Sequence, residues 1–185
     1  MIKFLGLLSK KKKVKPVTAA SIYVMVLQNV INEGFTEIKD FINNNSNLES
    51  NPNLNDKDVN WFSNVIFLGN LKNLEIYFEE NETVILRSLI LDEIHKEYEG
   101  NAHHLAIERF LDYENYFNDL IIKHEFMISA MAHAIFEKYK INDFQGDLFR
   151  KKNKPNPVFL TELKNLLSHF IWNWEDYLQK NKLDF

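Results

Sequence analysis

Apolar side chains recur at steps of three and four residues along almost every long segment of this chain. Between Pro16 and Asn43 they include Leu27, Val30, Ile31, Phe35, Ile38, Phe41 and Ile42. Such spacing places these side chains on one stripe of an α-helix, and no segment of useful length alternates with the period of two that a half-buried strand requires. The pattern therefore predicts an all-α fold.

The segment from about 59 to 80 is predicted to be the second and central helix. Apolar residues cover almost its whole circumference, as in a helix that neighbours surround on every side. Gly69, in the middle of this segment, costs about 1 kcal/mol of helix propensity relative to Ala. We expect that its lack of a side chain allows another backbone to approach closely, with a bound ligand as the alternative. The apolar set is Trp61, Phe62, Val65, Ile66, Phe67, Leu68, Leu71, Leu74, Ile76, Tyr77 and Phe78.

Three further regions read as helical. The first runs from about 83 to 99, and Gly100 is a stop signal. Residues 102–140 are too long for one ordinary helix, so we expect two helices or one bent helix, with polar breaks near 112–115 and 118–119. The last helix opens at Pro157, with Asn156 as its cap.

These segments together predict one bundle of five to seven helices over residues 16–185, preceded by a basic tail at residues 1–15. The chain has 185 residues, of which 45% are hydrophobic, enough for one domain with a core. It contains no Cys, which excludes disulfides and thiolate ligands and fits a cytoplasmic location.

Charge is distributed unevenly. Six lysines precede the first acid, Glu33, so residues 16–185 carry 16 basic against 26 acidic groups. Residues 79–125 concentrate the imbalance, with twelve acids against four bases. Such a surface repels nucleic acid and favours a basic protein partner. We expect that partner to contact the acids Glu93, Glu97, Glu99, Glu108 and Asp112.

The N-terminus combines an apolar tip, Met1 to Leu8, with the lysine cluster Lys10 to Lys13. A secretory signal is not favoured, because no small-residue cleavage site follows the apolar run that begins at Val17. The tip and its lysines could instead give weak, reversible contact between residues 1–15 and an anionic membrane surface. Packing of the tip on the domain is the alternative interpretation.

Residues 92–104 hold three histidines and four carboxylates. In one continuous helix, Asp92, His95 and Glu99 would share a face opposite the apolar stripe, and His103 and His104 would follow one turn later. Carboxylates and imidazoles at this spacing are ligands for Zn, Fe or Mn. We interpret the face as solvated, because bundle metal sites lie on inward faces, and keep the metal site as the alternative.

Two histidines and one tryptophan outside this segment are further candidates, with Trp172 interpreted by default as part of the core and its rim. His124 lies on an apolar stripe and is read as a core histidine, with a catalytic base as the alternative. His133 is read as an exposed partner of Glu137, four residues later. Trp172 lies off the stripe of the last helix and could anchor a partner.

The chain lacks the phosphate-binding, nucleophile-elbow and H-E-x-x-H motifs that mark common catalytic sites. The sequence therefore favours a non-enzymatic helical binding protein, of the immunity or adaptor type, that uses an acidic surface and needs no cofactor. A metal-dependent helical enzyme using residues 92–104 is the alternative.

Overall fold

The computed structural model describes residues 11–185 and confirms the all-α, single-domain fold. Its elements are β1 (Lys12–Val14), α1 (Pro16–Asn43), η1 (Asp56–Asp58), α2 (Val59–Lys72), α3 (Leu74–Tyr77), α4 (Glu80–Ile94), α5 (Gly100–His124), α6 (Met127–Lys138), η2 (Ile141–Phe144), α7 (Asp147–Arg150), α8 (Pro157–Ser168), α9 (Trp174–Lys180) and β2 (Asn181–Leu183).

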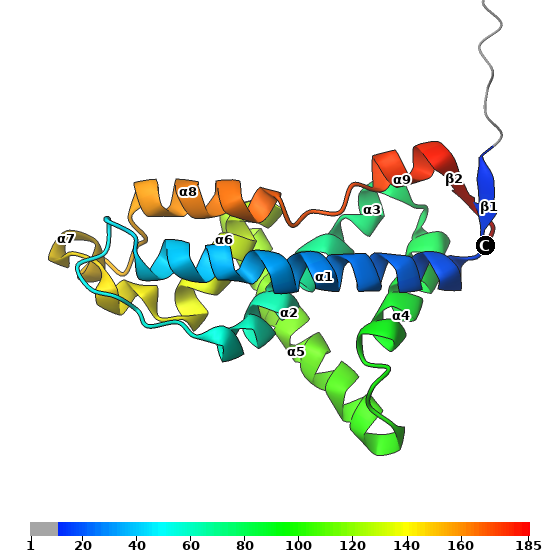
Figure 1. Cartoon of the computed structure of the whole chain (residues 1–185), viewed down its shortest axis with the longest axis horizontal. Helices are drawn as coiled ribbons and strands as arrows, with labels where there is room; N and C mark the ends of the chain where they lie inside the picture. Colours follow the sequence, from blue (N-terminus) through cyan, green and yellow to red (C-terminus); the bar gives the residue numbers. More distant parts are fainter. Residues whose placement is uncertain (1–10) are drawn as a thin grey trace, which may run out of the picture.

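Helix α1 is the longest element and forms one side of the bundle, with α8 alongside one half and α4 packed against the other (Figure 1). Helix α2 contacts α1, α5 and α6, and its side chains from Trp61 to Leu71 are largely buried. The core is one continuous cluster to which α1, α2, α4, α5, α6, α8 and α9 all contribute.

The predicted second helix is wrong at its C-terminal end. Helix α2 stops at Lys72, a single turn follows as α3, and Phe78 is extended. A capping box then opens α4, in which Glu79 accepts from the backbone three residues on and Glu82 accepts from the Glu79 N–H. The end of α2 at Lys72 was missed because apolar residues continue beyond it through Leu74, Ile76, Tyr77 and Phe78, so hydrophobic spacing alone shows no boundary there.

One predicted boundary later in the chain is confirmed, and two are wrong. Asn156 caps α8, accepting from the Val158 N–H at 2.9 Å. Residues 102–140 do form two helices, but the break falls at Glu125, whose φ of 65° is left-handed, and not at the polar residues 112–119. The last helix also divides, because α8 ends at Ser168 and Asn173 caps a separate α9.

Strands β1 and β2 form a small parallel pair with Lys12 opposite Asn181 and Val14 opposite Leu183. Three residues are too few for an alternating pattern to be recognised in the sequence. Residues 12–14, which the sequence places in the basic tail, thus pair with the C-terminal end of the chain (Figure 1). The predicted membrane contact of Met1 to Leu8 falls on residues 1–10, outside the part that the structure describes.

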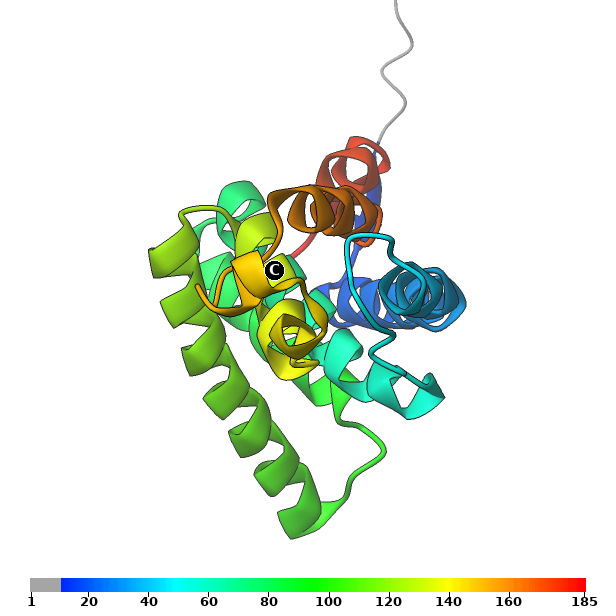
Figure 2. The same ribbon diagram turned by 90° about the vertical axis from the view of Figure 1, so that its left-hand side faces the viewer.

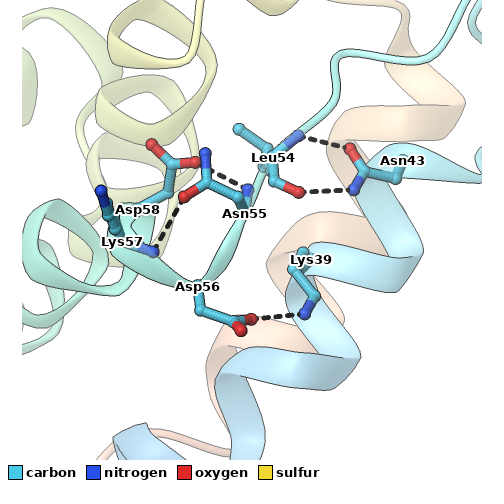
Figure 3. A network of polar contacts seen from close by, with 7 residues as sticks. All are labelled: Lys39, Asn43, Leu54, Asn55, Asp56, Lys57 and Asp58. Carbon is cyan, nitrogen blue, oxygen red and sulfur yellow. Dashed lines mark hydrogen bonds and ion pairs between the residues drawn. The ribbon is translucent and has the colours of Figure 1, made fainter.

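The loop between α1 and α2 is fixed by side-chain contacts (Figure 3). Asn43, at the end of α1, donates to the Leu54 carbonyl at 2.9 Å and accepts from the Leu54 N–H at 2.8 Å. Lys39 forms an ion pair with Asp56 at 2.7 Å. Asn55 and Asp58 form the capping box of η1. The Asn-rich loop is therefore held against α1 just where α2 begins.

Gly69 lies where α6 crosses α2. A Cβ placed there would be 2.5 Å from the Met131 sulfur, so the close approach comes from a side chain of α6 and not, as expected, from another backbone. Helix α6 packs on α2, α5 and α8, and this crossing is at the centre of the core.

Candidate functional site: the α4–α5 hairpin

Helices α4 and α5 with their connecting loop, residues 79–125, form what we call the α4–α5 hairpin. Helix α4 lies against α1, whereas α5 packs on α6 and α2. The two helices diverge, and the loop with the first turns of α5 projects from the rest of the molecule (Figures 1 and 2). An ion pair joins the two helices: the distance from Arg87 Nη2 on α4 to Glu114 Oε2 on α5 is 2.5 Å.

The prediction that His95 faces solvent is wrong. Helix α4 ends at Ile94, so His95 is its C-cap and turns inward, with only 7% of its surface exposed. Its Nδ1–H donates to the Leu91 carbonyl at 2.9 Å, and its ring packs edge-on against Phe110 of α5 with centroids 5.6 Å apart. Burial lowers the pKa of His95, so the imidazole is neutral near pH 7.

The five predicted metal ligands do not converge. His103 approaches His95 with ring centroids 6.5 Å apart, whereas Asp92, Glu99 and His104 are exposed. Because the helix ends before residue 95, the continuous face on which the expected spacing relied does not form. Among residues 11–185, no group of three or more His, Asp or Glu side chains is placed to hold a metal ion.

Of the five predicted partner-binding acids, four are exposed. Glu97 and Glu99 lie in the connecting loop, and Glu108 and Asp112 lie on α5. Glu93 differs, because its side chain is only 20% exposed and pairs with Lys96 at 2.6 Å. The hydrogen bond from Lys96 lowers the pKa of the Glu93 carboxyl. Glu93 is therefore charged, but its carboxylate is already paired with Lys96.

The α4–α5 hairpin carries most of the negative charge of the described part of the chain. It has twelve acids and four bases, a net charge of −8, whereas residues 126–185 have nine bases and seven acids, a net charge of +2. Within residues 11–185 its internal ion pairs between acids and Lys or Arg are Arg87–Glu114 and Lys96–Glu93, and His104 lies 3.5 Å from Glu108. Most of its carboxylates thus remain available to another molecule.

The prediction of His133 as an exposed partner of Glu137 is wrong. His133 is half-buried, and its ring stacks on that of His124 across the α5–α6 turn, with centroids 3.5 Å apart. Glu137 instead accepts from the Tyr116 hydroxyl at 2.7 Å. Nothing in the helical spacing could reveal this pair, because the two histidines belong to different helices.

Trp172, read as a possible anchor for a partner, packs within the protein. Its ring lies edge-on to Tyr23 at 5.5 Å and to Trp174 at 5.8 Å. Its backbone N–H donates to the side chain of Asn70 at 2.7 Å. These contacts make Trp172 part of the junction between α1, α2 and α9.

None of the helices within residues 11–185 combines the length and the apolar character that crossing a membrane requires. Comparisons of the chain with family models, with characterised proteins and with solved structures give no match.

Proposed function

We propose that this protein is a non-enzymatic binding protein of the cytoplasm that uses the α4–α5 hairpin to capture a basic protein. The single observation that carries the proposal is the exposure of Glu97 and Glu99 in the connecting loop and of Glu108 and Asp112 on α5. A partner with clustered lysines or arginines would replace water around carboxylates that the protein itself leaves mostly unpaired.

The net negative charge of the hairpin affects the rate of association before the two proteins touch. The net charge of −8 on the hairpin attracts a basic partner over about 10 Å at 0.1 M salt and repels nucleic acid. The Arg87–Glu114 ion pair supports this use, because it joins the two helices and holds the acids in one arrangement. An immunity-type protein or an adaptor would bind its partner in this way.

Zero-length carbodiimide crosslinking tests the proposal, because it joins carboxylates to lysines that are already in contact. The protein would be crosslinked in lysate of its source cells, and the crosslinked peptides would be identified by mass spectrometry. We expect crosslinks from Glu97, Glu99, Glu108 or Asp112 to lysines of one partner. Crosslinks that instead join lysines of residues 126–185 to acids of the partner would overturn the proposal.

A further inference from the structure

A cleft of about 330 Å³ lies between α2 and the turn from α4 into α5. Its size is within the range of small-molecule sites. None of the four exposed acids of the proposed partner-binding surface, Glu97, Glu99, Glu108 and Asp112, is among the residues that line the cleft. The lining residues that matter here are Asn64, His95, Tyr98, Arg109, Phe110 and Tyr113.

His95 lines the cleft and supplies it with a hydrogen-bond acceptor. Because its Nδ1–H donates to the Leu91 carbonyl, the neutral ring carries its lone pair on Nε2. That nitrogen makes no hydrogen bond within residues 11–185. An acceptor that the protein leaves free in a cleft wall can take a hydrogen bond from a donor of a bound ligand.

Aromatic rings form the walls beside this acceptor. Phe110 packs edge-on against His95, and Tyr98 lies 6.4 Å from the same ring, centroid to centroid. Tyr113 is held edge-on against Trp61 at 4.9 Å. Tyr98, Phe110 and Tyr113 all line the cleft, and an aromatic lining of this kind suits an aromatic or other flat apolar body.

Among the described residues that line the cleft, Arg109 is the one cationic side chain. Acids flank it in the sequence at Glu108 and Asp112, yet within residues 11–185 it forms no ion pair. A guanidinium presents a planar fork of donors that matches a carboxylate.

We propose that this cleft binds a small carboxylate with an aromatic body. Arg109 holds the carboxylate, the rings of Tyr98, Phe110 and Tyr113 flank the body, and Nε2 of His95 accepts a hydrogen bond from a ligand hydroxyl. The inference does not depend on the capture of a basic protein, because it uses different side chains.

Two probes of the same shape and opposite charge test the proposal: 4-hydroxyphenylacetate and tyramine. Binding would be followed by NMR titration of the full chain. We expect saturable binding of 4-hydroxyphenylacetate, at least tenfold weaker binding of tyramine, and at least tenfold weaker binding of the acid to the Arg109→Gln variant. Arg109 is exposed, so this substitution should leave the fold intact. Lys123→Gln is the matched control, because it removes one charge from the same helix away from the cleft and should change the affinity less than twofold.

Failure of 4-hydroxyphenylacetate to bind, equal or tighter binding of tyramine, or unchanged affinity in Arg109→Gln would overturn the proposal. The role of His95 has its own readout. Phenylacetate lacks the hydroxyl donor, so it should bind the unaltered protein more weakly than 4-hydroxyphenylacetate. His95→Phe keeps a ring in the core, and it should remove that difference between the two acids. A preference that persists in His95→Phe would exclude His95 as the acceptor.

Discussion

The imidazole rings of His124 and His133 lie within 7° of parallel, with their centroids 3.5 Å apart. One ring ends α5 and the other comes from the second turn of α6, so the stack holds the sharp turn at Glu125 between the two helices. His124 Nε2 is buried without a partner in the described part of the chain. Rings this close cannot both carry a proton at low cost, which makes the junction sensitive to acid.

We expect acid to destabilise the protein through this pair. Burial, with smaller contributions from His124, Lys123 and Lys164 that outweigh Glu137, lowers the pKa of His133 to about 4, and burial lowers the pKa of His124. The unfolded chain therefore binds more protons than the folded chain between about pH 6.5 and pH 4. Stability should be complete above that window and fall through it, by roughly 1–2 kcal/mol after allowance for solvent screening of half-buried groups.

Urea denaturation at about pH 7 and pH 4.5 measures this loss. The His133→Phe variant keeps a ring in the stack but cannot be protonated, so its loss should be clearly smaller. His104→Gln is the control, since His104 is exposed on α5, and it should behave as the unaltered protein. An equal loss in the unaltered protein and in His133→Phe would exclude the pair as the cause.

Asn70 should be among the most sensitive positions in the core. It is fully buried, and its side chain donates to the Ile66 and Phe170 carbonyls, both at 2.9 Å, and accepts from the Trp172 N–H. Asn70→Leu fills similar space but leaves the Phe170 carbonyl and the Trp172 N–H unpaired, so the free energy of unfolding should fall by about 3 kcal/mol. Asn60→Leu, at an exposed position of the same helix, should change it by less than about 0.5 kcal/mol. Equal effects would mean that Asn70 does not hold the 169–173 segment.

Gly69→Ala should destabilise the protein although Ala is the better helix former. The new Cβ would meet the Met131 side chain, with 2.5 Å to the sulfur. Overpacking of this kind costs about 1–3 kcal/mol, which exceeds the gain of about 1 kcal/mol in helix propensity. In a double-mutant cycle, Gly69→Ala combined with Met131→Ala should cost less than the two single changes added together. Additive effects would show that the two residues do not press on each other.

The sequence predicts the helices well where hydrophobic spacing and local caps agree. The stripe of α1 and the Asn156–Pro157 start of α8 are both local signals, and both are found in the structure. Prediction failed where a helix ended inside an apolar run. Lys72, His124 and Ser168 are such ends, and apolar residues continue beyond each of them, so the spacing within a single helix does not show where it stops.

The candidate site was predictable only in its charge. Four of the five acids expected to contact a partner are exposed, and Glu93 is the exception because Lys96 reaches it. The inward turn of His95 was not predictable, because it depends on Phe110, fifteen positions later, and on the early end of α4. The cleft with Arg109 likewise exists only after α2 and α5 have come together.

The most direct test of the capture of a basic partner by the hairpin is an association rate. The rate at which the protein binds the partner identified by crosslinking would be measured by stopped flow at about 20 mM and about 500 mM salt. One variant neutralises the hairpin acids (Glu97→Gln, Glu99→Gln, Glu108→Gln and Asp112→Asn). A matched variant neutralises four exposed acids on α1 and α9 (Glu33→Gln, Glu37→Gln, Asp40→Asn and Glu175→Gln).

Rim charges act mainly on association, so the hairpin variant should bind about tenfold more slowly at low salt and nearly as fast as the unaltered protein at high salt. The matched variant should stay within about twofold of the unaltered protein at both salt concentrations, because its acids lie outside the proposed surface. Equal slowing in the two variants, or no slowing in either, would contradict the capture of a basic partner by the α4–α5 hairpin.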